Sequence, residues 1–250
     1  MQVILVSLTP LVSTKDLYRL CEPLEASGRD CTDHWTRTRP TVDAVEHASK
    51  VPTGAMPIFF IDGAELNDGA LAWHFYDPLN GRPAARVYVG KSTGFNVGNS
   101  SVCELASHEL VEALADARLD KWRAHPFLDD TEVALEIADP VQTHYLVQSR
   151  GEKWRLANFI TPAYFDPSLV PPSRLNEFRA SGQRFDWAGE LRFPGDVGPS
   201  GYTTLRTPTE GGGWRLSVER AGRVPAEWSE EQRVAKEHPL SRTRLRQAVG

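Results

Sequence analysis

The sequence has few cysteines, no long apolar run and no excess of basic residues. Its three cysteines are scattered over 250 residues and form no CxxC pair, so they predict reduced, buried thiols and no disulfide framework. No apolar run approaches the roughly 20 residues of a membrane span. The formal net charge of −5 argues against general affinity for nucleic acid. We therefore expect neither a membrane nor a nucleic acid as partner.

The chain also lacks the marks of a signal peptide at its N-terminus. Residues 1–10 contain no basic stretch ahead of an apolar run and no small-residue cleavage site, and their pattern predicts a first strand. Apolar residues make up 40% and charged residues 24% of the chain, which is ordinary for a folded protein with a sizeable core. The length suits one large domain, or one domain with an appendage.

The most informative stretch is the run HELVE at positions 108–112, one residue away from the HExxH pattern of zinc hydrolases. On a helix, His108 and Glu112 share one face and can hold the same ion. Glu109 then lies beside the ion and is our candidate for the general base that activates water. A carboxylate in place of the second histidine makes the site more anionic and less selective for zinc over manganese or calcium.

The surrounding residues predict a capped helix over 101–116. Ser101 is the expected N-cap, with Glu104 three residues on as its capping-box partner. Glu104, His108, Glu112 and Asp116 recur every four residues along one side. Carboxylates at this spacing repel one another unless a cation neutralises them. The alternative is a solvated acidic stripe with one incidental histidine.

A metal ion needs at least a third ligand. The third histidine of the extended zinc-hydrolase pattern would fall on Arg118, which cannot bind a cation. We favour Asp139 or Glu136, near the end of an expected strand, as the distant ligand. Asp116, if the helix bends, and His125 or His144 are less favoured alternatives. His74 is a candidate substrate-binding residue; the alternative is that it only packs within a turn.

Periodicity gives a coarse map of the other elements. We expect strands at 2–8, 57–62, 84–89 and 132–139, a short strand at Trp35, helices at 14–27 and 41–50, an irregular segment at 64–79, hairpins from 144–148 with 154–160 and from 201–206 with 214–219, and a turn at 161–165. Proline and glycine become frequent after Phe165. This shift divides the chain into a metal-binding domain, 1–165, and a β-rich extension, 166–250, whose apolar and aromatic side chains should be packed away from water. The basic tail 233–246 is expected to be a solvated end.

Five elements in order resemble a poorly characterised family of bacteria and bacteriophages, whose members are described as zincin-like metallopeptidases or phage-related proteins. The elements are residues 69–74, 81–89, 107–116 (SHELVEALAD), 136–141 and 158–165. The resemblance implies an α+β, zincin-like fold with a metal-binding helix. It makes His108, Glu109, Glu112, Asp116, Glu136 and Asp139 the motif positions. The chain departs from the family pattern at Ala117, where proline is usual, and at Ala138, where cysteine is frequent.

Two function classes follow. The first is a metal-dependent peptidase or related hydrolase holding Zn²⁺ or another divalent ion, acting on a peptide or protein. Glu109 is its general base, Tyr164 steadies the oxyanion, and strand 84–89 pairs with the extended peptide. The second is a non-catalytic phage or virion structural or assembly protein, whose partners are virion components or further copies of itself and whose metal stabilises the fold. An injected effector is compatible with either. We accordingly expect a cytoplasmic or virion-associated location.

Overall fold

The computed structural model describes residues 1–63, 69–166, 168 and 175–220. It is a mixed α+β structure made of two compact units. The first unit comprises the described residues of Met1–Asp120 and His144–Ala157, and the second comprises Lys121–Thr143 and the described residues between Asn158 and Arg220. The boundaries of these units differ from the boundary at residue 165 that the composition suggests. The division into domains 1–165 and 166–250 stays a prediction.

The first unit is built on a five-stranded sheet. Its strand order is β2 (Thr41–Val45), β1 (Gln2–Ser7), β3 (Met56–Ile61), β5 (Arg82–Tyr88) and β4 (Ala72–Asp77). The pairs β1–β2, β1–β3 and β3–β5 are parallel, and β4 runs antiparallel to β5. β4 is therefore an end strand of the sheet, whereas β5 is paired on both sides.

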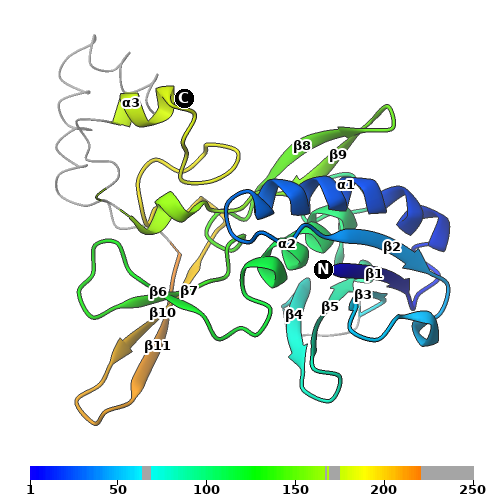
Figure 1. Ribbon diagram of the computed structural model, residues 1–250, viewed down its shortest axis with the longest axis horizontal. Helices are drawn as coiled ribbons and strands as arrows, with labels where there is room; N and C mark the ends of the chain where they lie inside the picture. The colour runs from blue at the N-terminus through cyan, green and yellow to red at the C-terminus, as the bar shows by residue number, and fades with distance from the viewer. Residues whose placement is uncertain (64–68, 167, 169–174, 221–250) are drawn as a thin grey trace. The chain divides into compact units, whose positions relative to one another are not determined.

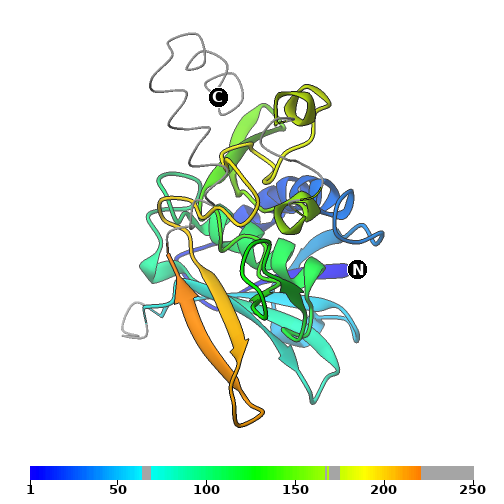
Figure 2. The same ribbon diagram turned by 90° about the vertical axis from the view of Figure 1, so that its left-hand side faces the viewer.

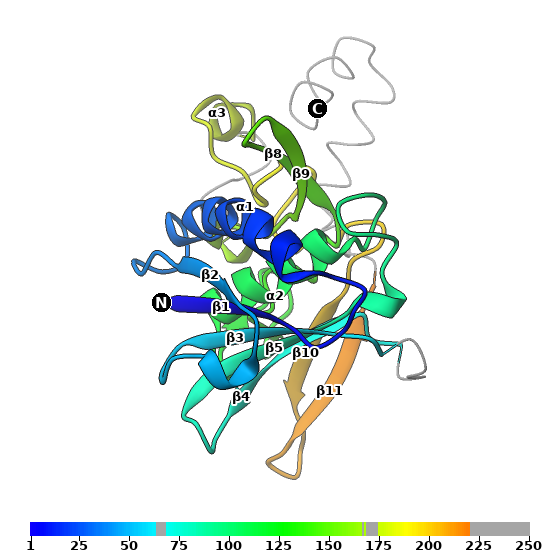
Figure 3. The same cartoon turned by 90° about the vertical axis from the view of Figure 1, so that its right-hand side faces the viewer.

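Two helices, α1 (Thr14–Thr32) and α2 (Val102–Ala115), cover one face of this sheet (Figures 1 and 3). α1 packs on β1 and β2, and α2 packs on β4 and β5. Their apolar sides close one core with the sheet, which includes Leu17, Leu20, Ala106, Leu110 and Val87. The hairpin of β8 (His144–Ser149) and β9 (Glu152–Ala157) packs against both helices. Short 3₁₀ turns, η1 (Ala48–Lys50) and η2 (Val89–Lys91), complete this unit.

α2 is fixed at both its N-terminus and its middle. Ser101 Oγ accepts a hydrogen bond from the Glu104 amide, as expected for an N-cap. The Glu104 carboxylate accepts from the Ser100 amide, one residue earlier than in a capping box. In the middle, the buried Ser107 Oγ accepts a 2.7 Å hydrogen bond from the Ala157 amide of β9. The motif helix is thus tied to the hairpin beside it.

The second unit contains a four-stranded sheet in the order β11 (Trp214–Glu219), β10 (Thr203–Pro208), β7 (Glu132–Ala134) and β6 (Trp122–Ala124). β10 and β11 form the long hairpin coloured gold to orange in Figure 2. The unit also holds the 3₁₀ turn η3 (Pro162–Phe165) and the helix α3 (Leu175–Ala180). Several apolar residues expected to be packed are buried, namely Phe185, Leu191, Phe193 and Leu205, whereas Trp214 is 52% exposed.

Several expected elements are confirmed. Seven expected elements occur within a few residues of their expected bounds. They are the first strand, the strands β3 and β5, the helices at 14–27 and 101–116, and both hairpins. Cys31 and Cys103 are buried free thiols, and Cys21 is a half-buried one. In the described part of the chain no helix is long and apolar enough to cross a membrane. The basic tail 233–246 lies outside the described residues.

Four local predictions are wrong. Residues 41–50 form β2 and η1 in place of a helix, because Val42 and Ala44 alternate inward and pair in register with β1. Trp35 lies in a bend and not in a strand. The segment expected to be irregular contains β4. The strand expected over 132–139 ends at Ala134, so Glu136 and Asp139 lie outside it.

Candidate metal centre

The candidate metal centre lies where α2 faces the end strand β4. Helical spacing places His108 and Glu112 four residues apart on α2, with Glu109 beside them. Side chains alternate along β4, and His74 is paired with the buried Ala85 on the helix-covered face of the sheet. His74 therefore points at α2, while its neighbour Trp73 points away and contacts Arg86. His74 lies in a strand, so the turn suggested by the sequence is wrong.

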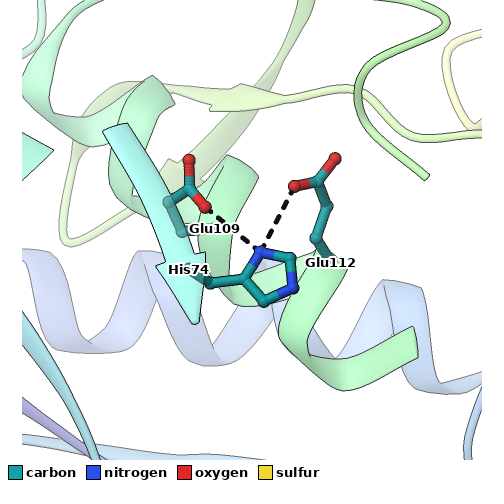
Figure 4. A group of neighbouring side chains, drawn as sticks. All are labelled: His74, Glu109 and Glu112. Carbon is teal, nitrogen blue, oxygen red and sulfur yellow. Dashed lines mark hydrogen bonds and ion pairs between the residues drawn. The ribbon is translucent and has the colours of Figure 1, made fainter. Parts of the chain in front are cut away.

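Three buried side chains converge at this point (Figure 4). His74 Nδ1 lies 3.3 Å from Glu109 Oε2 and 3.5 Å from Glu112 Oε2. Their side chains are only 2%, 4% and 5% exposed, respectively. On the other side of Glu112, its Oε1 lies 3.3 Å from His108 Nε2, and the His108 side chain is 15% exposed. The two carboxylates and two imidazoles thus form one cluster, with His108 nearest to water.

The contact made by His74 Nε2 determines which ring nitrogen of His74 carries the hydrogen. His74 Nε2 lies 3.3 Å from the backbone carbonyl oxygen of Asp116, at the end of α2. A carbonyl oxygen can only accept, so Nε2 is the donor in this contact. Nδ1 is then left facing two carboxylate oxygens. Either a proton or a metal ion must lie between these atoms, because their lone pairs would otherwise repel one another in a buried site.

The protonation of these four side chains follows from the same contacts. Burial alone would lower the pKa of His74, but hydrogen bonds and negative charge from Glu109 and Glu112 raise it to about 10. Burial raises the pKa of Glu109. Burial also acts to raise the pKa of Glu112, but His108 and His74 outweigh it and hold that pKa well below its usual range. These directions favour an anionic Glu112 and a proton on the contact between His74 and Glu109.

The kinds of ligand atom and the nitrogen–oxygen distances in the cluster match those around a divalent cation. Tetrahedral zinc holds nitrogen and oxygen ligands at about 2.0–2.2 Å, which sets neighbouring ligand atoms roughly 3.3–3.6 Å apart. The N–O pairs of His108 with Glu112, and of His74 with Glu109 and Glu112, are all 3.3–3.5 Å apart. Imidazole and carboxylate ligands suit Zn²⁺ and Mn²⁺. These groups could therefore hold a divalent ion.

Glu136, Asp139 and Tyr164 belong to the second unit. Asp139 is buried in a turn, where its Oδ1 accepts a hydrogen bond from Gln142 Nε2, and Glu136 is half-buried. Tyr164 is buried in η3, and burial together with the charges of Asp196 and Glu219 raises the pKa of its hydroxyl. Their roles as ligands and as oxyanion donor stay predictions.

The less favoured ligands have other contacts. His125 Nδ1 accepts hydrogen bonds from the amides of Phe127 and Leu128. His144 Nδ1 lies 3.1 Å from an Arg155 nitrogen. Asp116 is the C-cap of α2 and contributes its carbonyl oxygen to His74. These contacts give each residue a structural role.

Sequence reasoning missed that His74 lies in this cluster of histidines and glutamates, and its expected role in substrate binding stays a prediction. The available signal was the aromatic run 72–76, AWHFY, followed by Asn80-Gly81. Such a run before an Asn-Gly pair predicts a strand that turns into the next one. Comparisons with models of protein families, with curated proteins and with solved structures found no match to this chain. The resemblance to the zincin-like family therefore stays a prediction.

Proposed function

We propose that the protein is a metal-dependent hydrolase of peptide bonds. Its ion, with Zn²⁺ as the first expectation, is held by His108 and Glu112 and by Asp139 or Glu136 as third ligand. The observation that carries this proposal is the cluster at α2, where the HExxE residues are gathered in a buried site at ligand spacing. The mixed sheet, with an antiparallel end strand packed on the motif helix, supports a zincin-like fold.

In this proposal each residue of the cluster has a defined task. A bound ion supplies a Lewis acid, which polarises the scissile carbonyl and makes water more acidic. Glu109 accepts the proton from water at a carboxylate oxygen and passes it to the leaving amine. His74 holds Glu109 in place through its 3.3 Å contact and is itself oriented by the Asp116 carbonyl. Tyr164 donates to the oxyanion.

The peptide would pair with β4, not with the strand at 84–89 that the sequence suggested. β5 already has β3 on one side and β4 on the other, so its hydrogen-bonding edges are both used. β4 is the end of its sheet and carries His74. An extended peptide added to β4 would therefore run directly beside the candidate metal centre.

The burial of the cluster favours one alternative, a non-catalytic phage or virion structural protein that keeps the metal for stability. His74, Glu109 and Glu112 are almost fully buried, as in closed structural sites. The partial exposure of His108 favours the hydrolase, because catalysis needs one coordination position open to water. A structural protein would have virion components or further copies of itself as partners, whereas a hydrolase would have a peptide or protein as substrate.

The proposal is tested by metal content and hydrolysis together. The wild type and Glu109→Gln are loaded with one equivalent of Zn²⁺ and incubated with a mixed-sequence peptide library. We expect both to retain zinc, since Glu109 is not a ligand of the proposed ion, and only the wild type to cleave. Loss of this zinc from Glu109→Gln would show that the roles are assigned wrongly. Zinc retention without cleavage by the wild type would favour the structural alternative.

A further inference from the structure

The two carboxylate oxygens of Glu112 face different histidines. Oε1 lies 3.3 Å from His108 Nε2, while Oε2 lies 3.5 Å from His74 Nδ1. The histidines come from different elements, α2 and β4. A carboxylate that serves a single ion needs only one of these contacts. Glu112 instead presents one oxygen to each of two nitrogen ligands.

The side of Glu112 that faces His74 has its own set of three candidate ligand atoms, separate from His108. His74, Glu109 and Glu112 offer one nitrogen and two oxygen atoms that all lie within 4.8 Å of one another. All three residues are buried and belong to the first unit. The Asp116 carbonyl accepts from His74 Nε2 and so leaves Nδ1 as the ligand atom. Backbone carbonyls hold the histidines of many metal sites in this way.

We propose that His74 Nδ1, Glu109 and Glu112 form a second cation site, and that Glu112 bridges it to the ion on His108. The chemical class of the ion is a divalent cation that accepts mixed imidazole and carboxylate ligands, Zn²⁺ or Mn²⁺. A cation there neutralises the negative charge of two carboxylates that are buried together.

This inference rests on the proposed function in one respect, the role of Glu109. If Glu109 is the proton acceptor, an ion in the second site binds that carboxylate and removes the acceptor. The second ion is then inhibitory: the hydrolase is active with one ion per chain and is shut down as the second site fills. The metal concentration would thereby regulate the same site that it activates.

The test is a zinc titration of the full chain, followed by calorimetry and by ion content after equilibrium dialysis. We expect two ions per wild-type chain, bound in two separable steps. His74→Phe, which keeps a ring in β4 but no ligand atom, and Glu109→Gln should each lose one ion or weaken one step at least tenfold. The matched control is Glu104→Gln, which alters a buried glutamate of α2 that belongs to neither site and should still bind two ions. Circular dichroism establishes that each variant is folded.

The outcomes separate this inference from the proposed function. One ion per wild-type chain, lost in His108→Ala and retained in both His74→Phe and Glu109→Gln, would overturn the second site and leave the first intact. Two ions in the wild type, with one lost in His74→Phe and none in His108→Ala, would support the second site and overturn the proposed ligand set of the first. Two ions in His74→Phe and in Glu109→Gln would also overturn the second site.

Discussion

Ser107, the residue before the metal-binding histidine, should matter for stability although it binds no metal in our proposal. Its Oγ is fully buried, accepts from the Ala157 amide of β9 at 2.7 Å and donates to the Glu104 carbonyl at 2.9 Å. Ser107→Ala removes the hydroxyl oxygen that accepts the hydrogen bond of the buried Ala157 amide. An unsatisfied buried amide costs about 1–3 kcal/mol. We therefore expect a loss of about 2 kcal/mol of unfolding free energy.

The assay is urea unfolding in the presence of a chelator, with Ser101→Ala and Ser217→Ala as companions. Ser101→Ala removes a helix N-cap and should cost about 1 kcal/mol. Ser217 is exposed on β11, so its truncation should stay within about 0.5 kcal/mol. Hydrogen exchange gives an independent readout, since the Ala157 amide should exchange faster in Ser107→Ala. A Ser107→Ala variant as stable as Ser217→Ala, with unchanged exchange at Ala157, would refute the reasoning.

Three further predictions concern the first unit. Gly28→Ala should destabilise the protein by about 1–3 kcal/mol in urea unfolding, because the added Cβ would lie 2.2 Å from Pro40 Cγ; a gain in stability, as expected from helix propensity alone, would contradict this. The hydrogen bond with Ser13 lowers the pKa of Asp16. The contribution of the ionised Asp16 carboxylate to the free energy of unfolding is therefore fully present above the unfolded-state pKa, and it is lost as pH falls through the lower folded-state pKa. The stability difference between wild type and Asp16→Asn should hold above about pH 5 and shrink in more acidic solution; a difference that grows on acidification would be contrary. Burial, with negative charge from nearby carboxylates, raises the pKa of Cys21 to about 12, so iodoacetamide should label it far more slowly at pH 8 in the folded than in the urea-unfolded chain, as followed by mass spectrometry; equal rates would disprove this.

The elements that the sequence predicted well are those whose signals are local. The cap at Ser101 and the apolar spacing of α2 define a helix without knowledge of its neighbours. The β8–β9 hairpin is similarly marked by its Arg150-Gly151 turn, where both residues have positive φ. β2 was misjudged because residues 41–45 acquire strand structure by parallel pairing with β1, which is 39 positions away in register. No local pattern reports such a pairing.

The residues of the candidate site likewise differ in whether a local pattern in the sequence reveals them. His108, Glu109 and Glu112 could be found from sequence because helical spacing alone brings them together. His74 is separated by 35 residues from Glu109, and its place in the cluster depends on β4 being the strand that α2 covers. The contact between His74 Nε2 and the Asp116 carbonyl involves a backbone atom. Sequence alone gives no sign of such a contact.

The central claim is that α2 holds a divalent ion through Glu112, and ion content tests it most directly. The wild type and Glu112→Ala are each incubated with excess Zn²⁺, freed of unbound metal by gel filtration and measured by elemental analysis. We expect bound zinc in the wild type and almost none in Glu112→Ala, because both candidate sites use this carboxylate. A wild type free of zinc, or equal zinc in a folded Glu112→Ala variant, would contradict the claim.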